Sequence, residues 1–586
     1  MLQDQVAASG SKEAFRYLEG ERWVSLSWTQ TKNKAYQLAA GLLALGIQRE
    51  DRVAIACNTR IEWILADLAI MCAGGATTTV YPTTAHGDVS FILADSESKI
   101  VFAEDAAQVA KILDHLDTLP ALTTVVQIDG KTDHPKVVSW AELAQRSADH
   151  LLADPDAVDE AIAGIEPEHL ATIIYTSGTT GKPKGVRLVQ DSWTYEGAAV
   201  EEYDIISPDD LHYLWLPLSH VFGKALITIQ LRIGFTTAVD GRIDKIVENL
   251  GQVHPTFMAG APRIFEKVRA RVMTTASHGL KAKIFDWAFA VGRKVTPLRL
   301  AGKEPTGLLK VQHALADRLV FSKIKERMGG KIRFFVSGSA ALNREVQEWF
   351  YAAGLLVLEG YGLTETGVPT CVANPRSTRF GTVGPPIPGT EVKIAEDGEI
   401  LVSGPGVMRG YHNQPDATAE VLKDGWFATG DIGELDDLGY LRITDRKKDL
   451  IKTSGGKYVA PQKVEGVLKL VCPYISQVVV HGDRRKYVSA LITLDPEAIE
   501  GWAAEQGKTG SSAAELAGSS EVRELIEGYV ASANQKLERW ETVKRFEILP
   551  SELTVDEGEV TPSLKIRRRA VEKKYADRLD AMYDKE

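Results

Sequence analysis

The stretch from Tyr175 to Val186 reads YTSGTTGKPKGV and is the most informative segment of this 586-residue chain. Its glycines allow the backbone to approach an anion closely and to turn N–H groups toward it. Its hydroxyl side chains can donate hydrogen bonds, while Lys182 and Lys184 supply positive charge. The apolar run from Leu170 to Tyr175 predicts a strand that leads into this loop. The composition therefore predicts a loop that holds a polyphosphate.

The spacing of this loop differs from that of the commonest polyphosphate loop. A Walker A loop needs a glycine, four further residues and then Gly-Lys-Ser/Thr. Here Pro183 follows Gly181 and Lys182, and Thr176 stands where the first glycine would be. An ordinary surface turn is the other alternative, but turns seldom combine so many glycine, threonine and lysine residues. The better interpretation is a polyphosphate loop of another kind.

Length and composition set further limits. A chain of 586 residues is too long for one hydrophobic core, so two or more domains are expected. Hydrophobic residues make up 44% of the chain and the mean hydropathy is -0.12, which is ordinary for a globular protein. The formal net charge of -11 argues against general nucleic-acid binding, because that function favours a basic surface.

The cysteines and the apolar segments bear on the cellular compartment. Cys57, Cys72, Cys371 and Cys472 form no closely spaced pair, so neither a zinc site nor a disulfide framework is indicated. The N-terminus lacks the basic start and apolar stretch of a secretory signal, and the most apolar window, residues 63–76, is too short to span a bilayer. We expect a soluble, cytoplasmic protein. Peripheral membrane contact and the choice between monomer and homodimer stay open.

Helix and strand patterns alternate through the first 165 residues. An amphipathic helix at 28–45, a strand at 52–57, a helix at 61–73 and a strand at 100–103 predict parallel sheets flanked by helices. The acidic stretch from Pro155 to Pro167 is typical of a linker. A helix-rich stretch runs from Arg263 to Gly330, and Gly/Pro turns between short apolar runs predict a small β-barrel at about 381–444. A boundary at Asp445 leaves a C-terminal domain long enough to fold alone.

Two later segments have a buried strand followed by small or polar residues. EGYGLTETG, from Glu359 to Gly367, follows the apolar run 355–358, and ligands of α/β sheets bind at such carboxyl ends. Glu365 is a hard oxygen ligand suited to Mg²⁺, and Tyr361 offers an aromatic face to a purine. VSGSAAL, residues 336–342, has a similar form. A solvated Thr-Glu-Thr turn is the alternative for the first segment.

Single polar residues stand out in two other motifs. His220 lies within LWLPLSHVFG, where an apolar setting is also typical of a structural histidine. Asp431 lies within WFATGDIG, and a carboxylate in such a turn can accept both hydroxyls of a ribose. An Asx-turn is the alternative for Asp431. The basic cluster at 567–574 is most simply a solvated helix face.

Together, seven motifs in order between Tyr175 and Lys565 resemble the adenylate-forming superfamily, which includes acyl-CoA synthetases, luciferases and peptide-synthetase adenylation domains. APRIFEKV at 261–268, the helix-rich stretch after it and the run 424–450 are most similar to long-chain fatty acyl-CoA synthetases. The patterns and the resemblance imply an α/β fold. We expect a large N-terminal domain, 1–444, of two parallel-type sheets with flanking helices and the small β-barrel subdomain, and a smaller, mobile α+β C-terminal domain, 445–586.

The resemblance also implies a set of site residues. It implies catalytic roles for Lys565, Glu365, Thr176 and His220, with Mg²⁺ held by Thr176 and Glu365. It implies a hinge at Lys448 and a loop at Gly455 and Gly456 on the side of coenzyme A. The implied nucleotide contacts are Thr176, Ser177, Gly178, Thr179, Thr180, Gly181, Lys184, Val221, Gly338, Ser339, Ala340, Glu359, Gly360, Tyr361, Thr364, Asp431, Arg446, Lys452 and Tyr458. The chain departs from many relatives at Leu564, where they have glycine before the lysine.

The implied activity has two steps. A fatty acid carboxylate attacks ATP to give acyl-AMP and pyrophosphate, and the thiol of CoA then takes the acyl group and releases AMP. Three alternatives remain: a fatty acyl-AMP ligase that stops at the adenylate, a non-catalytic acyl or nucleotide sensor, and a peptide-synthetase adenylation domain. The last would need a carrier domain, but only 21 residues, with no serine, follow Lys565. We also expect the loop from Thr176 to Lys184 to be poorly ordered without phosphate.

Overall fold

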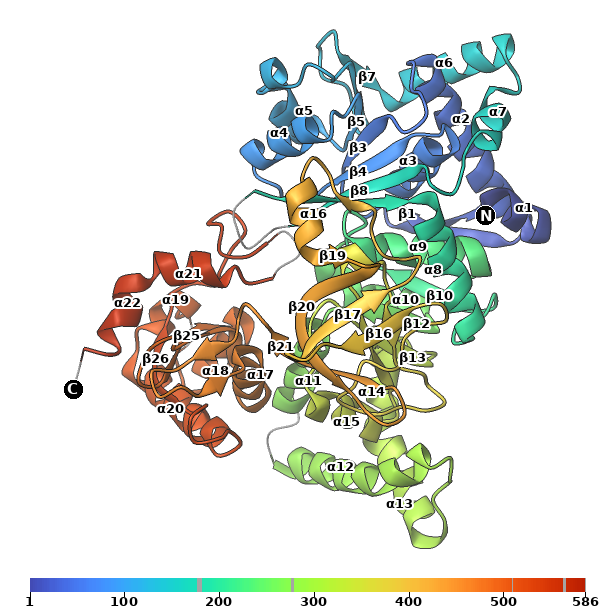
Figure 1. Ribbon diagram of the computed structural model, residues 1–586. Helices are drawn as coiled ribbons and strands as arrows, with labels where there is room; N and C mark the ends of the chain where they lie inside the picture. Colours follow the sequence, from blue (N-terminus) through green and yellow to red (C-terminus); the bar gives the residue numbers. More distant parts are fainter. Residues whose placement is uncertain (177–181, 276–278, 509, 562–564, 585–586) are drawn as a thin grey trace.

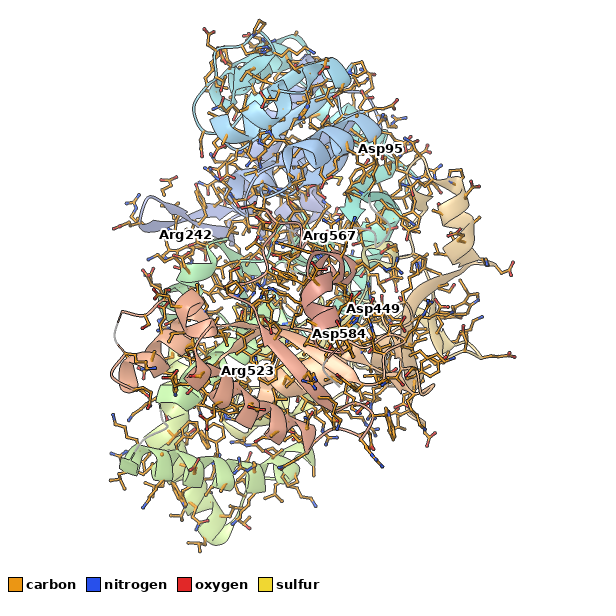
Figure 2. All side chains as sticks on the ribbon, turned by 90° about the vertical axis from the view of Figure 1, so that its left-hand side faces the viewer. Asp95, Arg242, Asp449, Arg523, Arg567 and Asp584 are labelled. Atoms are coloured by element: carbon orange, nitrogen blue, oxygen red, sulfur yellow. The ribbon has the colours of Figure 1, made fainter. Side chains whose placement is uncertain are left out.

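The computed structural model describes residues 1–176, 182–275, 279–508, 510–561 and 565–584. It confirms the predicted class, an α/β fold with a large N-terminal part and a smaller C-terminal part (Figure 1). The C-terminal part faces the viewer in Figure 2. Ser177 to Gly181, for which we predicted poor order, lie outside the described residues.

The first sheet contains the strand that leads into the opening loop. Its order is β18-β9-β8-β4-β3-β5-β6-β7, and the strands from β8 to β7 are parallel. Parallel strands are usually covered on both faces, and every residue of β4 and β5 is buried. The strands are β3 (Arg52–Ala56), β4 (Ala76–Val80), β5 (Ile100–Ala103), β6 (Thr124–Gln127), β7 (Val137–Ser139), β8 (Leu170–Thr176), β9 (Lys184–Val189) and β18 (Gly410–Tyr411). The helices are α2 (Trp28–Ala44), α3 (Ile61–Cys72), α4 (His86–Asp95), α5 (Ala106–Leu113), α6 (Trp140–Ala153) and α7 (Ala157–Ala163).

The second sheet packs beside the first through a shared hydrophobic core. Its order is β15-β14-β13-β12-β10-β11-β1-β2, again parallel in its centre. The strands are β1 (Glu13–Glu19), β2 (Arg22–Ser27), β10 (Leu211–Leu214), β11 (Thr236–Val239), β12 (Phe257–Gly260), β13 (Phe334–Ser337), β14 (Val357–Tyr361) and β15 (Cys371–Val372). The helices are α1 (Leu2–Ser9), α8 (Gln190–Tyr203), α9 (Val221–Ile233), α10 (Ile246–Val253), α11 (Pro262–Thr275) and α15 (Arg344–Ala352).

A helical hairpin extends from one end of the N-terminal part (Figure 1). It consists of α12 (Gly279–Leu300), α13 (Gly307–Ala316), the π-helical segment η3 (Asp317–Phe321) and α14 (Ser322–Arg327). Phe289 of α12 stacks on Trp349 of α15 with ring centroids 4.8 Å apart, which fixes the hairpin to the second sheet's layer of helices. This is the helix-rich stretch that the sequence predicts.

The β-rich region predicted at about 381–444 is a five-stranded antiparallel sheet. It contains β16 (Glu391–Ile394), β17 (Glu399–Ser403), β19 (Leu422–Lys423), β20 (Trp426–Leu435) and β21 (Leu441–Arg446), with α16 (Pro415–Val421) before β19. Throughout residues 391–446, all described, β20 is the central strand, and β16 and β21 pair with different strands. The sheet is therefore open, whereas the sequence analysis expected a barrel.

The C-terminal part has its own hydrophobic clusters around a three-stranded sheet. Its elements are β22 (Ile451–Lys452), β23 (Tyr458–Val459), α17 (Pro461–Val471), β24 (Ile475–His481), β25 (Val488–Leu494), α18 (Pro496–Glu505), α19 (Ala513–Ala517), α20 (Ser520–Asn534), β26 (Val543–Ile548), α21 (Arg568–Lys574) and α22 (Ala576–Ala581). Within the described residues, no helix has the length and apolar character needed to cross a bilayer.

Candidate functional site

The two ends of the opening loop lie next to each other. β8 and β9 are antiparallel, and Thr176 at the end of β8 pairs with Lys184 at the start of β9. Thr176 Oγ1 lies 3.5 Å from the carbonyl oxygen of Lys184. The ammonium of Lys184 lies 4.7 Å from the centre of the Tyr411 ring. The strand pairing therefore fixes both ends of the loop, while Ser177, Gly178, Thr179, Thr180 and Gly181 lie outside the described residues.

Glu365 lies beside this loop, in the short helix η4 (Thr364–Thr366). Tyr411 Oη donates a hydrogen bond of 3.0 Å to Glu365 Oε1. The Tyr411 ring thus joins the carboxylate to the lysine at the end of the loop, and β9 contacts η4 directly. Sequence reasoning missed Tyr411; its only signal is a tyrosine in the Gly-Tyr-His segment at 410–412.

The donors at this point suit a hard cation that is shared with phosphate. Thr176 and Glu365 offer one hydroxyl and one carboxylate. Among the described residues, no group of three or more His, Cys, Asp and Glu side chains could hold a metal ion. Mg²⁺ usually keeps several waters and takes only one or two carboxylates together with substrate phosphates. The residues therefore fit Mg²⁺ as a partner of bound phosphate, and they do not form a protein cage.

The ends of β13 and β14 form a second wall. Ser337 and Glu359 are paired across these parallel strands, so the segment from Gly338 to Ala340 starts beside Glu359. The backbone N–H of Leu342 donates to Glu359 Oε2 over 3.0 Å. Burial raises the pKa of Glu359 to about 8, so its carboxyl group is largely protonated at neutral pH. Ser339 adopts a left-handed φ of 70° at the turn.

A cross-strand pair on β20 and β21 faces Tyr361. Asp431 lies opposite Arg446, whose Nε donates to Asp431 Oδ1 over 3.0 Å. Tyr361 Oη donates to Asp431 Oδ2 over 2.9 Å. The sequence analysis expected Asp431 in a turn, but it lies within β20, directly after Gly430 with a φ of 73°. Both carboxylate oxygens therefore already have partners from two other segments.

His220 caps a helix that begins at the site. Its Nδ1 accepts a 3.2 Å hydrogen bond from the backbone N–H of Phe222, so it is the N-cap of α9. Burial lowers the pKa of His220 to about 3, and the positive charge of Lys565 acts in the same direction. The imidazole is therefore neutral at physiological pH, with the proton on Nε2. Val221, the next residue, is buried.

Lys565 comes to this group from the C-terminal part. The surrounding protein lowers its pKa by desolvation, and the charge of Arg446 adds to the effect. The charges of Asp431 and Glu365 oppose it. Lys565 is exposed. The charges of Arg446, Asp431 and Glu365 act on the pKa of Lys565, and the charge of Lys565 acts on the pKa of His220, so these groups lie within electrostatic range of one another.

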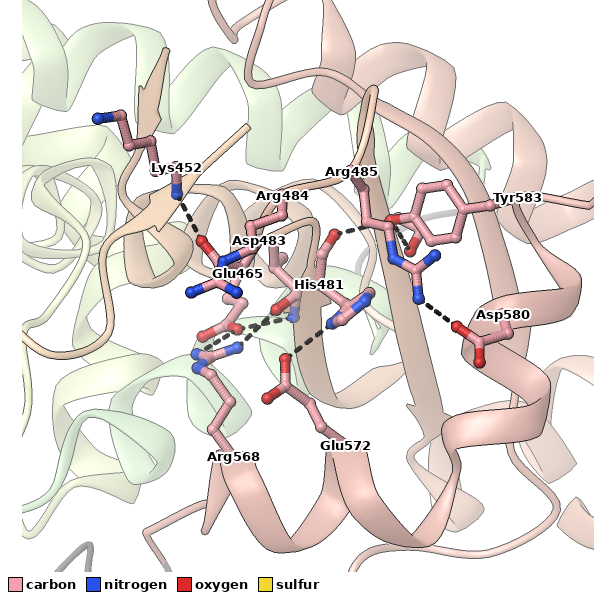
Figure 3. Close-up of polar contacts among 12 residues, drawn as sticks. Lys452, Glu465, His481, Asp483, Arg484, Arg485, Arg568, Glu572, Asp580 and Tyr583 are labelled. Carbon is pink, nitrogen blue, oxygen red and sulfur yellow. Dashed lines mark hydrogen bonds and ion pairs between the residues drawn. The ribbon is translucent and has the colours of Figure 1, made fainter. Parts of the chain in front are cut away.

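A buried network fixes the helix that follows Lys565 (Figure 3). Arg568 at the start of α21 forms a 2.7 Å ion pair with Glu465 of α17 and donates to the carbonyl of Val480 over 2.8 Å. Glu572 accepts a 2.8 Å contact from His481 Nδ1. The sequence analysis interpreted this basic cluster as a solvated helix face. That interpretation is wrong for Arg568, because its guanidinium packs inward against a carboxylate that no local pattern reveals.

A separate hairpin carries two of the implied nucleotide contacts, Lys452 and Tyr458, and the implied CoA-side loop. Lys452 and Tyr458 pair across β22 and β23, and the ammonium of Lys452 lies 5.4 Å from the centre of the Tyr458 ring. Gly455 and Gly456 form the tip of this hairpin, and Tyr458 is 59% exposed. Lys448 lies in an exposed turn directly after β21. The structure places these residues with one another and not in the Asp431 group.

A buried ion pair lies beneath the site. Lys224 of α9 contacts Asp67 Oδ2 of α3 at 2.5 Å, and Thr77 of β4 donates to Asp67 Oδ1 at 2.7 Å. Lys224 is one helical turn after His220, so the pair ties the start of α9 to both neighbouring elements. The sequence contained a signal for it, because Asp67 and Lys224 each interrupt a strongly apolar helix.

The family comparisons assign this two-part fold to the adenylate-forming class of protein. The chain belongs to the AMP-binding enzyme family: that family's model matches residues 2–412. The model of the AMP-binding enzyme C-terminal domain matches residues 448–586.

Relatives and solved structures agree with this assignment. The chain is 37% identical to the long-chain-fatty-acid–CoA ligase FadD15 of Mycobacterium bovis, over 96% of this chain and 93% of that protein. It is 30% identical to the long-chain-fatty-acid–CoA ligase ACSBG2 of Xenopus laevis, over 100% of this chain and 83% of that protein. Its fold is similar to that of the anthranilate CoA ligase AuaEII in complex with anthranoyl-AMP, with a TM-score of 0.74 and 19% identity over 99% and 97% of the chains.

Proposed function

We propose that the chain is an AMP-forming long-chain fatty acid–CoA ligase. ATP, CoA and a fatty acid are its substrates, with Mg²⁺ as the cofactor. The observation that supports this most strongly is the site that Glu365, Asp431 and Arg446 form with Tyr361 and Tyr411, within electrostatic range of Lys565 from the C-terminal part. A lysine on a separate domain can neutralise negative charge at a nucleotide site in one step. The movement of that domain can then withdraw the lysine for the next step.

In the first step, a carboxylate oxygen of the fatty acid attacks the α-phosphorus of ATP. The bond from that phosphorus to the bridging oxygen breaks, and pyrophosphate leaves. Both reactants are anions, so Lys565, Lys184 and the backbone N–H groups of the opening loop would stabilise the charge that accumulates. Mg²⁺ held by Glu365 and Thr176 would neutralise phosphate charge when bound. Asp431 and Arg446 would hold the ribose, with the Tyr361 ring against the base.

In the second step, the sulfur of CoA attacks the carbonyl carbon of acyl-AMP. The bond from that carbon to the phosphate oxygen breaks, AMP leaves, and the thiol proton passes to solvent. We infer that the C-terminal part rotates about Lys448, which withdraws Lys565 and brings the hairpin with Gly455 and Gly456 toward CoA. Lys448 itself is exposed in this turn, a position that is suited to such a change.

Long-chain acids are the substrate class that we propose. The segments at 261–268 and 424–450 support it by their similarity to long-chain synthetases, and so do the relatives named above. Burying each methylene contributes about 0.8 kcal/mol, so an apolar acyl pocket can separate palmitate from acetate by several kcal/mol.

The buried free thiols support a reducing, cytoplasmic location.

A series of saturated acids from acetate to eicosanoate tests the substrate class. We expect kcat/KM for CoA thioester formation to rise with chain length and to reach its maximum among the long-chain acids. A preference for acetate or for aryl acids, measured under the same conditions, would show that the assignment is wrong.

A further inference from the structure

We propose that the helical hairpin of α12, α13, η3 and α14, residues 279–327, docks on an anionic lipid surface. The proposal concerns a part of the molecule that takes no part in the site described above. It rests on an exposed apolar stripe, a local excess of positive charge and the position of the hairpin in the fold.

The apolar stripe runs along the helix formed by α13 and η3. Leu308, Val311, Leu315 and Leu319 are spaced by three and four residues, so they lie on one side of that helix. They are 73%, 65%, 48% and 40% exposed. The opposite side already packs inward through Leu309 and Ala316. Apolar residues normally face the core, so a helix with a second, exposed apolar face indicates a surface for a partner.

The charge around this stripe is opposite to that of the whole chain. Residues 279–327 contain eleven Lys and Arg against four Asp and Glu, a formal charge of +7, whereas the chain carries -11. Lys310 and Arg318 are exposed on the same helix as the stripe. A helix that presents exposed apolar residues together with cations is suited to the boundary between lipid headgroups and acyl chains, because long cationic side chains can reach toward the headgroups.

The position of the hairpin leaves its stripe accessible. In both views the hairpin lies at one end of the molecule (Figures 1 and 2). Phe289 packs against Trp349 at 4.8 Å and against Phe321 at 5.3 Å, so the hairpin is anchored at its base. Leu280 and Leu300, at the two ends of α12, are also exposed, by 74% and 43%.

Lipid fits these features better than a second copy of the chain. The stripe consists of four side chains on one helix, to which a bilayer can adapt, whereas a stable protein interface buries about 1,200–2,000 Å² of surface. The proposed function adds one argument that depends on it: long-chain acids partition into bilayers, so docking would place the enzyme where its substrate is concentrated.

Co-sedimentation with lipid vesicles tests the proposal. The vesicles are pure phosphatidylcholine, or phosphatidylcholine mixed with phosphatidylglycerol. We expect the full chain to bind the mixed vesicles and to bind them at least about tenfold more weakly after Leu308→Gln with Leu315→Gln. Lys310→Glu with Arg318→Glu should weaken binding by a similar factor or more, and added salt should mimic this second change.

Matched controls carry the same substitutions at exposed positions elsewhere. Leu152 and Leu438 are 83% and 64% exposed, so Leu152→Gln with Leu438→Gln should leave binding unchanged. Lys12→Glu with Lys423→Glu makes the same change in charge on exposed residues away from the hairpin. All variants should retain the thermal midpoint and the kcat/KM for a water-soluble acid, which separates failure of this proposal from failure of the proposed function.

A second readout locates the contact. The four native cysteines are buried, so a polarity-sensitive fluorophore can be attached at Val311→Cys alone. Its emission should shift to the blue with mixed vesicles, and the same probe at Leu152→Cys should not respond. The proposal would be overturned by equal binding to both kinds of vesicle or by loss of binding in the control variants. It would also be overturned if the parent chain bound no vesicles but formed a homodimer that Leu308→Gln with Leu315→Gln dissociates.

Discussion

At the scale of single residues, Lys565 links the two parts of the molecule. The pKa of Lys565 responds to the charges of Arg446, Asp431 and Glu365, all of which belong to the N-terminal part or its last strand. We expect Lys565→Ala to slow acyl-AMP formation by about 100- to 1,000-fold, because one preorganised charge in the transition state is lost. Thioester formation from supplied acyl-AMP should change little. Rapid-quench measurement of each half-reaction checks this, and equal loss of both would contradict the role.

Asp445, just before the turn that contains Lys448, is a buried carboxyl group whose Oδ2 has no hydrogen-bond partner among the described residues. Burial raises its pKa to about 7, and the charges of Glu465 and Asp449 act in the same direction. The pKa of an aspartate in an unfolded chain is about 3.9, so the unfolded state releases this proton at a lower pH than the folded state. Folding stability therefore falls between about pH 4 and pH 7, and the penalty is complete above pH 7.

Asp445→Asn removes this penalty. We expect the variant to gain up to about 4 kcal/mol over the parent chain above pH 7 and almost nothing below pH 4. Thermal midpoints measured across this range check the sign. A difference between variant and parent that does not change with pH would show that Asp445 does not titrate in this window.

Many residues at this scale were predictable because their motifs are contiguous. Thr176, Glu365, Asp431 and Lys565 each stand in a short run with its own chemical signal. Tyr411, Glu465 and Arg568 were not predictable, because their partners are distant in sequence. The hydrogen bond of Tyr411 to Glu365 spans 46 residues, and only the pairing of β18 with β9 brings the two together.

At the scale of elements, α11 joins the two parts of the molecule. Arg263 contacts Glu552 and Ser476 at 2.7 and 2.8 Å, and Glu266 contacts Lys469 at 3.0 Å. Further along, Arg269 donates to the carbonyl of Leu470 at 3.2 Å, and Arg271 contacts Glu497 at 3.1 Å. Every partner lies in the C-terminal part. We infer that this face of α11 holds the orientation in which Lys565 reaches the site.

Arg263→Ala tests this role for α11. We expect acyl-AMP formation to slow about two- to fivefold, since partly exposed ion pairs contribute up to about 1 kcal/mol each. The second half-reaction should be unaffected or faster, and moderate salt should reproduce the effect in the parent chain. Arg232→Ala is the matched control, because its pair with Glu201 stays within the N-terminal part. Equal slowing in both variants would contradict the inference.

Elements with strong local patterns were predicted closely. The strand at 100–103 matches β5, and the helices at 28–45 and 61–73 match α2 and α3 to within a residue. The stretch from Pro155 to Pro167, predicted as a linker, contains α7 instead. Ala157 and Val158 are buried there against the first layer of helices. Its acidic composition suggests exposure, but tertiary packing decides the conformation.

At the scale of the whole molecule, two separately packed parts share one site. The sequence predicted this division because β-rich and α+β patterns meet near residue 445. The relative position of the parts depends on contacts such as those of α11, which have no signature in the sequence. We infer that this orientation serves the first step through Lys565 and that the second step needs another.

The most direct measurement is the release of pyrophosphate and AMP with ATP, Mg²⁺ and palmitate, with and without CoA. Without CoA, we expect pyrophosphate release to stop near about one equivalent per protein, because acyl-AMP stays bound. With CoA, both products should form continuously in equal amounts while palmitoyl-CoA accumulates. Pyrophosphate release that CoA does not change would indicate a ligase that stops at the adenylate. No palmitate-dependent release at all would contradict the enzyme activity itself.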